Sequence, residues 1–204
     1  MYMPILPVHI KTMRYTKPPT IDFFYPVVEG MRDQAVEQRI NHQIAGLMYS
    51  LIAELHQPGM TTYITGQYEI KANERNVLSL ILSALGDFGG AHPMTYIRSL
   101  NFDVTTGTSY PLRAQFKPVS DYVTVLSDII HLQIEERDLP LLGEFEGIRP
   151  DQDYYIVDNV LVIYFQLYEI SPYAAGFPYF PIPLYKIESI LSENGLLQPM
   201  MGMI

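Results

Sequence analysis

The most regular pattern in the chain is a stripe of apolar residues between positions 30 and 57. Apolar side chains recur there at spacings of three and four, the period of one face of an α-helix. Its members are Val36, Ile40, Ile44, Leu47, Met48, Leu51, Ile52 and Leu55. Gln-Pro-Gly at 57–59 ends the pattern, because proline and glycine stop helices. The stripe therefore predicts a long helix that packs by this face against a core.

Alternating apolar and polar positions predict strands on both sides of this helix. Pro26 indicates that one of them is an edge strand or leaves the sheet there. Gly107, in the turn Thr-Thr-Gly-Thr, is free to take a positive φ. Asn-Glu-Arg-Asn at 73–76 predicts a hairpin turn. Residues 75–85 also fit a helical spacing, but the turns around them favour a strand. The predicted strands cover 5–15, 20–28, 61–73, 77–85 and 92–104.

The last third of the chain repeats this mixture. Residues 118–136 predict a second helix with a cap near Ser120, and 154–170 a hairpin that turns at Asp158-Asn159. Residues 184–191 predict a short last helix. The fold class is therefore α+β, an antiparallel β-sheet packed by a long helix in the N-terminal half and by a second helix. The predicted parts are N-terminal strands (1–28), an α+β core (29–192) and an apolar tail (193–204).

The stretch 168–183, Tyr-Glu-Ile-Ser-Pro-Tyr-Ala-Ala-Gly-Phe-Pro-Tyr-Phe-Pro-Ile-Pro, is rich in proline and aromatic residues. Proline fixes φ and removes an N–H donor, so residues 171–183 cannot form a regular central strand. Aromatic rings on such a stiff backbone are either anchors of an exposed binding surface or lids over the core. We expect packing for Tyr168, Glu169, Tyr173 and Gly176, and weigh exposed binding for Phe177, Tyr179 and Phe180.

The negative net charge of the chain limits the kinds of molecule that it can bind. The 204 residues carry a net charge of −9, which disfavours nucleic acid as a ligand. Seven acidic residues lie between 135 and 153, against Arg137 and Arg149, a local charge of −5. This segment is either a solvated loop or a landing site for a basic partner.

The sequence contains no cysteine, and we find in it neither a targeting signal nor a membrane-spanning segment. Without cysteine there is no disulfide and no thiol nucleophile. No apolar run approaches the 18 residues of a membrane span, and the start does not resemble a secretory signal. As written, we expect a cytoplasmic chain. The ends, Met-Tyr-Met-Pro-Ile-Leu-Pro-Val and Leu-Leu-Gln-Pro-Met-Met-Gly-Met-Ile, are apolar, so we expect each to dock on its own domain or on a neighbouring chain of a homo-oligomer.

Motifs for catalysis, metal or cofactor binding are not found, so none of these is predicted. His92 follows two glycines, and either it bonds carbonyls of its loop or it is a ligand or catalytic residue with Asp87 as its local acid. His131 and Glu135 are four residues apart, which predicts an exposed pair on a helix.

Three phrases together resemble a known family. They are Gly-Gly-Ala-His-Pro at 89–93, the segment 96–116 with Phe-Asp-Val-Thr-Thr-Gly, and the segment 161–177 with Tyr-Glu-Ile-Ser-Pro-Tyr-Ala-Ala-Gly. They resemble the domain of unknown function shared by the lysozyme-binding anti-sigma factor RsiV and the non-catalytic region of the peptidoglycan deacetylase PdaC. The resemblance covers about residues 60–191. The membrane span and sigma-binding segment of RsiV and the deacetylase domain of PdaC are not in this sequence.

The resemblance implies a stand-alone copy of an extracytoplasmic ligand-binding module, which in RsiV grips lysozyme. The leading hypothesis is a non-enzymatic binding module for a lysozyme-like protein, whose basic charge suits an acidic surface, or for a cell-wall glycan. The alternatives are a structural or assembly protein of a bacterial spore or cell surface, and a cell-wall hydrolase acting around His92. The candidate binding residues are Pro172, Tyr173, Phe177, Tyr179, Phe180 and His92.

Overall fold

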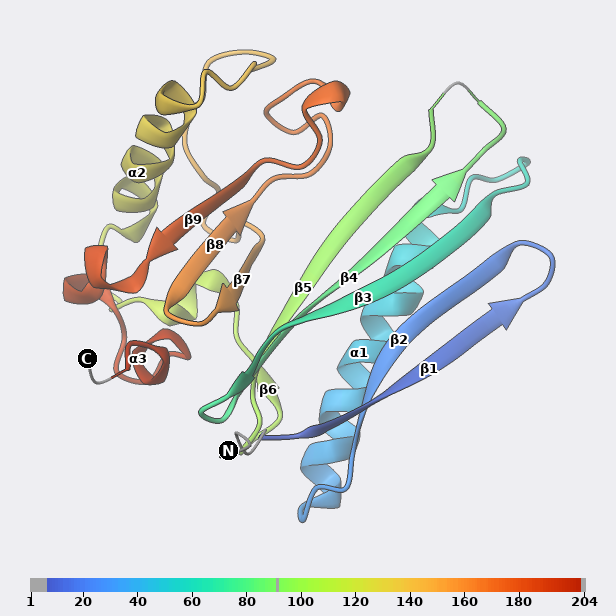
Figure 1. Ribbon diagram of the computed structural model, residues 1–204, viewed down its shortest axis with the longest axis horizontal. Helices are drawn as coiled ribbons and strands as arrows, with labels where there is room; N and C mark the ends of the chain where they lie inside the picture. The colour runs from blue at the N-terminus through green and yellow to red at the C-terminus, as the bar shows by residue number, and fades with distance from the viewer. Residues whose placement is uncertain (1–6, 91, 203–204) are drawn as a thin grey trace, which may run out of the picture. The chain divides into compact units, whose positions relative to one another are not determined.

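The computed structural model describes residues 7–90 and 92–202. The chain forms two compact units, Met1–Ser109 and Tyr110–Ile204, each with its own sheet and helices (Figure 1). The predicted α+β class, with a mostly antiparallel sheet, a long helix and a second helix, is confirmed. No helix among the described residues is long and apolar enough to cross a membrane.

The first unit contains a six-stranded sheet in the order β1-β2-β3-β4-β5-β6. All neighbouring strands pair antiparallel except β2 and β3, which are parallel. The sheet is mostly antiparallel, as expected, and this pair is the exception, because the chain crosses over through a helix between β2 and β3 and returns in the same direction. The strands are β1 (His9–Lys17), β2 (Ile21–Glu29), β3 (Tyr63–Glu74), β4 (Val77–Asp87), β5 (Met94–Asp103) and β6 (Thr108–Ser109).

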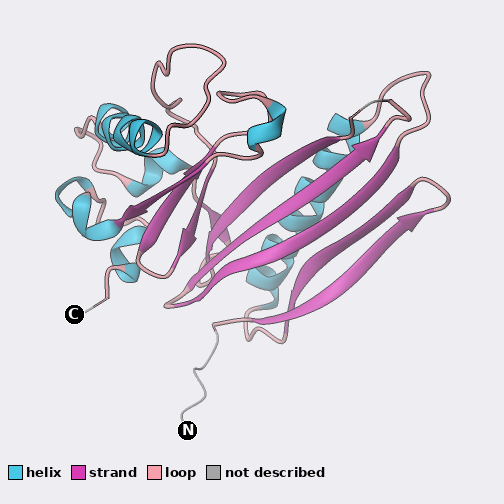
Figure 2. Cartoon of the chain, turned by 45° about the horizontal axis from the view of Figure 1, so that its top comes forward, coloured by secondary structure: helices cyan, strands magenta, loops and turns pink. Residues whose placement is uncertain are grey.

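The crossover helix is α1 (Gln34–Leu55), and it covers one face of this sheet (Figure 2). The Asp33 side chain accepts hydrogen bonds from the first free N–H groups, of Ala35 and Val36, and so caps the helix. The predicted stripe is the buried face, since Ile40, Ile44 and Leu51 are fully buried against Phe23 and the even positions of β4. The pattern of the sequence therefore located the core of the first unit.

The predicted turns of the first unit are also confirmed. Arg75 and Asn76 both have positive φ, 52° and 63°, and join β3 to β4 in a two-residue turn. Gly107 takes φ +70° between β5 and β6, as expected. Residues 77–87 form a strand rather than a helix, so the choice between the two patterns at 75–85 was correct.

The second unit packs α2 (Tyr122–Glu136) with a three-stranded antiparallel sheet in the order β7-β8-β9. Strands β7 (Tyr154–Val157) and β8 (Val160–Tyr164) form the predicted hairpin, with Asp158 at φ +48°. The cap of α2 is Asp121, whose carboxylate accepts from Thr124 N–H at 3.3 Å. The prediction of Ser120 was wrong, because that hydroxyl donates to Lys117 O instead.

Strand β9 (Tyr179–Pro183) lies at the edge of this sheet despite its prolines. At one end of β9, Pro178 O accepts a hydrogen bond from Phe165 N–H, and at the other end Leu184 N–H donates to Asn159 O. The backbone N–H and C=O groups of the even positions of β9 therefore point toward β8. Pro181 and Pro183 occupy odd positions, where a missing N–H removes no bond of the ladder. This agrees with the prediction that 171–183 is not a central strand.

Gln133 of α2 and Arg137, which follows the last residue of α2, cover the outer edge of β9. Arg137 donates to Tyr179 O at 2.7 Å, and Gln133 donates to Pro181 O at 3.1 Å. The Arg137 guanidinium also lies 5.3 Å from the centre of the Phe180 ring. An exposed edge strand can pair with other chains, and these contacts satisfy its free carbonyls.

Two local predictions for the C-terminal region need correction. Strand β8 ends at Tyr164 instead of continuing to 170, because Gln166 N–H donates to Glu169 and the chain turns there. Residues 184–191 form two 3-10 turns, Leu184–Lys186 and Glu188–Ile190. A helix cannot continue through 191, since Leu191 is extended and bridges to Phe116.

The C-terminal tail lies against its own unit. It contains the short helix α3 (Leu197–Met200), and Leu196, Leu197 and Met200 are buried. This is one of the two arrangements expected for the tail, and the homo-oligomer stays a prediction. The expected docking of the N-terminal end falls mainly on residues 1–6, which lie outside the described residues.

Candidate functional site

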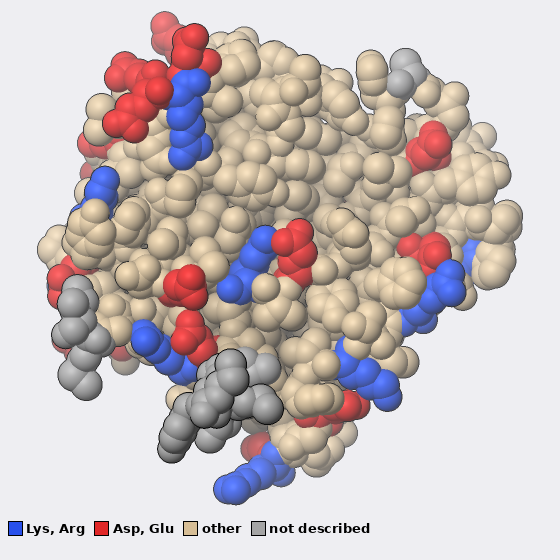
Figure 3. All heavy atoms as spheres, viewed as in Figure 1, with Lys and Arg blue, Asp and Glu red and all other residues tan. Residues whose placement is uncertain are grey.

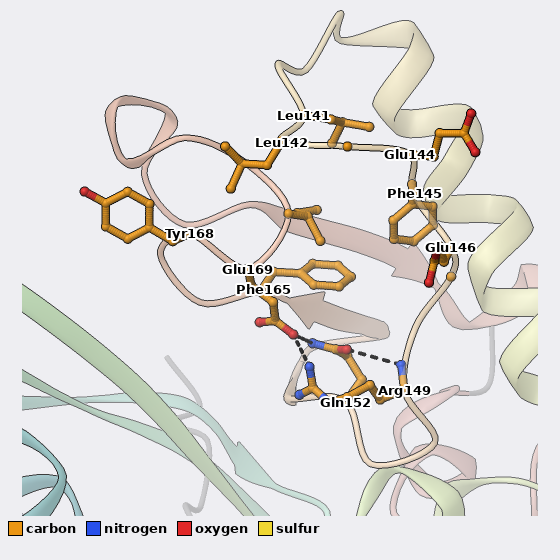
Figure 4. A pocket seen from close by; sticks show the side chains of 13 residues that line it. Leu141, Leu142, Glu144, Phe145, Glu146, Arg149, Gln152, Phe165, Tyr168 and Glu169 are labelled. Carbon is orange, nitrogen blue, oxygen red and sulfur yellow. Dashed lines mark hydrogen bonds and ion pairs between the residues drawn. The ribbon is translucent and has the colours of Figure 1, made fainter.

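A pocket of about 470 Å³ opens in the second unit between the loop that follows α2 and the turn that follows β8 (Figure 4). The loop contributes Leu142, Glu144, Phe145 and Glu146, and the turn contributes Tyr168 and Glu169. Clefts with an apolar interior and a few polar groups are the usual form of a binding site. This pocket is therefore the first candidate for one.

Glu169 holds the polar side of the pocket together. Its Oε2 accepts from Gln166 N–H at 2.6 Å, and its Oε1 accepts from Gln152 Nε2 at 3.3 Å and from Arg149. Gln152 is buried and also donates to Tyr164 O at 2.9 Å. Charge-assisted hydrogen bonds thus join the turn to the loop at Arg149 and Gln152, and they fix the chain at these two positions before any ligand arrives.

Arg149 stays charged in this setting. Burial lowers the pKa of the Arg149 guanidinium, but the hydrogen bond and charge of Glu169 together with the charges of Asp151 and Asp153 raise that pKa above its ordinary value. Because the guanidinium is half exposed, we assign this pair a role in ordering the loop rather than a large share of stability.

Aromatic and apolar side chains form the other side of the pocket. The Phe145 ring meets the buried Phe165 ring edge to face, with centroids 5.9 Å apart. At the rim, Leu142 is 57% exposed and Tyr168 is 51% exposed, so the packing expected for Tyr168 is wrong. The Tyr168 ring points away from the pocket in Figure 4 and lies 5.5 Å from the Tyr173 ring. Large exposed apolar groups gathered at one opening are typical of an interaction surface.

Unpaired acidic groups stand beside this apolar rim. Glu144 and Glu146 are exposed, and no ion pair among the described residues involves either of them. On the face shown in Figure 3, acidic side chains gather where α2 and the loop after it lie. The pocket therefore combines a fixed floor, an apolar rim and uncompensated negative charge.

The structure brings only part of the predicted aromatic surface to this pocket. Pro172 and Tyr173 begin a 3-10 turn, and Tyr173 reaches the rim through its contact with Tyr168. Phe177 and Tyr179 are half-buried with ring centres 6.5 Å apart. The expectation of an exposed ring is wrong for Phe180, which is 0% exposed because even positions of β9 face the core with Phe165. The binding roles of these residues stay predictions.

His92 lies in the first unit, exposed in the loop between β4 and β5. The nearby Asp87 carboxylate accepts from Gly89 N–H at 2.8 Å, so that carboxylate already serves the turn. Within residues 7–90 and 92–202, no three His, Asp or Glu residues are placed to hold a metal ion. His131 and Glu135 form the expected exposed pair on α2, 3.3 Å apart. Any role for His92 stays a prediction.

Sequence reasoning gave the acidic segment 135–153 as one possible landing site for a basic partner, but it did not identify Phe145 or the glycines beside it. Residues 143–147 read Gly-Glu-Phe-Glu-Gly, an aromatic residue between two acids and two glycines. A large apolar residue is unusual in a fully solvated loop, so Phe145 was the one sequence feature that indicated a packed loop here. The roles of Gln152 and Glu169 depend on contacts between distant positions, for which a single sequence carries no pattern.

Comparison with protein families places this pocket in a recognised region. Residues 116–185 match the model of DUF3298, a family of proteins of unknown function. The matched range contains α2, the loop, the pocket and β9. No curated protein matches the chain.

Two solved structures of DUF3298 proteins share the fold. One, from Bacteroides fragilis NCTC 9343, is 15% identical with a TM-score of 0.72, covering 96% of this chain and 98% of that one. The other, from Pseudomonas aeruginosa PAO1, is also 15% identical with a TM-score of 0.64, covering 94% of this chain and 96% of that one. At this identity the likeness shows the fold, and it extends over both units.

Proposed function

We propose that the chain is a binding module and that the pocket of its second unit takes a basic protein ligand. The observation that carries the proposal is the pair Glu144 and Glu146, which are exposed next to the apolar rim of Leu142 and Tyr168 and form no ion pair within residues 7–90 and 92–202. A ligand that presents cationic side chains around an apolar group complements both features.

Preorganisation supports this function. Ordering a loop on binding costs free energy, and a loop already fixed in the free protein avoids much of that cost. The bonds of Glu169 to Arg149 and Gln152 fix the floor of the pocket, and the bond of Leu142 N–H to Ile170 O fixes one point of its rim. The floor and Leu142 can therefore make contacts without first being ordered.

A lysozyme-like protein is the ligand that fits best. Such a protein is basic, and the resemblance of residues 60–191 to the RsiV domain, which binds lysozyme, favours the same class. A cell-wall glycan is the second candidate, because the neighbouring rings of Tyr168 and Tyr173 offer faces on which sugars stack. A neutral glycan leaves the acidic rim unused, so we favour the protein.

Neutralising the two rim acids should weaken lysozyme binding. We expect Glu144→Gln with Glu146→Gln to lower the affinity for hen egg-white lysozyme about tenfold, since each lost exposed charge pair is worth up to about 1 kcal/mol. Isothermal titration calorimetry at low and moderate salt measures this. Binding by the unchanged chain should also weaken with salt, because exposed charges are screened.

A matched control removes two acids elsewhere in the same unit. Glu188→Gln with Glu193→Gln changes the net charge equally at exposed positions outside the pocket, and its affinity should stay close to that of the unchanged chain. If both double variants lost the same amount of affinity for lysozyme, the loss would be due to the net charge of the chain and not to the pocket. If neither lysozyme nor muropeptides bind at micromolar protein, the proposed function is wrong.

A further inference from the structure

The segment Gly143–Glu144–Phe145–Glu146–Gly147, which we call the strap, crosses the pocket between two fixed points. On one side, Leu142 N–H donates to Ile170 O at 3.0 Å. On the other, Ile148 N–H donates to Ser127 Oγ at 3.0 Å, and the Ile148 side chain is buried. Both ends of the strap are therefore anchored to the body of the unit.

Between these anchors the strap is held by little. Within the described part of the chain, no hydrogen bond or ion pair reaches residues 143–147. Gly143 has no neighbour within 4 Å of the place a Cβ would take. Gly147 has φ +106°, a conformation that favours glycine, and a Cβ there would come within 2.9 Å of Ser127 Oγ, so only glycine fits at this end. Hinges are formed by a few residues that absorb backbone rotation, and glycines at both ends suit that role.

The Phe145 ring packs the middle of the strap against the pocket. It is half-buried, points into the pocket in Figure 4 and meets Phe165 edge to face. Phe165 is 2% exposed, and its other aromatic neighbour is Phe180, with centroids 5.7 Å apart. Lifting Phe145 would thus open an aromatic surface inside the pocket.

We propose that Phe145 is a built-in occupant of this pocket, which an aromatic or large aliphatic side chain of the ligand replaces as the strap swings outward on Gly143 and Gly147. The proposal rests on the proposed function for the location of the ligand and adds the chemistry of the group that enters. Glu144 and Glu146, on either side of Phe145, select a ligand with positive charge beside the entering side chain.

A built-in occupant lowers the apparent affinity for the ligand, because only the fraction of molecules with the strap open can bind. Removing the ring should therefore raise the affinity for a small probe of the same chemistry. We expect Phe145→Ala to bind the capped peptide acetyl-Lys-Phe-Lys-amide about tenfold more tightly than the unchanged chain does. Titration followed by NMR suits the weak binding expected of a tripeptide.

Two further peptides and two variants make the test specific. Acetyl-Lys-Ala-Lys-amide should gain nothing from Phe145→Ala, and acetyl-Glu-Phe-Glu-amide should bind neither protein. Phe24→Ala removes an exposed ring from the first unit and should leave all three titrations unchanged. Phe145→Leu keeps part of the side chain and should give a smaller gain, which also serves if the alanine variant does not fold.

Equal affinity of the unchanged chain and the Phe145 variants for acetyl-Lys-Phe-Lys-amide would overturn the proposal, as would an equal gain for the alanine peptide. The outcome is separable from the lysozyme test. If lysozyme binds but Phe145→Ala does not bind the peptide more tightly, the proposal that Phe145 occupies the pocket is wrong and the proposed function stands. If Phe145→Ala binds the peptide more tightly but lysozyme does not bind, Phe145 is an occupant of the pocket and lysozyme is not the ligand.

Discussion

Replacing Gly66 with alanine is expected to destabilise the first unit by about 3 kcal/mol. Gly66 in β3 lies opposite Phe23 in the parallel pair with β2, and the Phe23 ring packs over its backbone. An added Cβ would come within 2.1 Å of Phe23 Cδ2, far inside van der Waals contact. Because Phe23 is fully buried in the core beneath α1, its ring has no solvent to move into.

Gly46→Ala is the matched control for this prediction. It makes the same chemical change in α1, on the exposed side, where a Cβ meets nothing within 4 Å. The effect on the unfolded chain is the same in both variants, but here alanine should stabilise by about 1 kcal/mol. Urea unfolding followed by circular dichroism measures both. A Gly66→Ala variant as stable as the unchanged chain would show that Phe23 does not lie over this strand.

The second large effect is expected at Gln115, a fully buried polar residue that holds the C-terminal tail. Its Oε1 accepts from Leu196 N–H at 2.8 Å, and its Nε2 donates to Tyr154 Oη at 2.8 Å. Gln115→Leu keeps the volume but leaves a buried N–H without an acceptor. We expect a loss of about 3 kcal/mol and faster amide exchange over residues 192–202.

Gln198→Leu, at an exposed position of α3, is the control and should change stability by less than about 0.5 kcal/mol. Normal stability and slow exchange in Gln115→Leu would mean that the tail is held by its apolar side chains alone. A homo-oligomer built by exchange of tails would have to break and remake the bond of Gln115 to Leu196, so the same variant would also weaken it.

Elements with a strong local pattern could be predicted from the sequence. The stripe of α1 and the hairpin turns at Arg75-Asn76 and Asp158-Asn159 follow from side-chain spacing and from residues that tolerate positive φ. The parallel pairing of β2 with β3 could not be predicted, because it depends on where the chain returns after α1. The helix expected at 184–191 failed for a similar reason, since the bridge of Leu191 to Phe116 extends the chain there.

The candidate site was only partly predictable. The acidic composition of 135–153 and the stiff aromatic stretch from 168 indicated two separate features, and a landing site for a basic partner was one interpretation of the first. The acidic segment and the aromatic stretch line the same pocket because Glu169 bonds to Arg149 and Gln152. These contacts between distant positions cannot be predicted from the sequence. The sequence left Phe180 open to either exposed binding or packing, because periodicity within a proline-rich stretch does not reveal which positions face a neighbouring strand.

Hydrogen–deuterium exchange of the chain, with and without hen egg-white lysozyme, tests the central claim most directly. The amides of residues 143–147 have no hydrogen-bond acceptor within the described part of the chain and should exchange quickly in the free protein. If the pocket is the binding site, lysozyme should slow exchange over 142–149 and 166–173 and leave α1 unchanged. Unchanged exchange in both segments at saturating lysozyme, or protection confined to the first unit, would contradict the account.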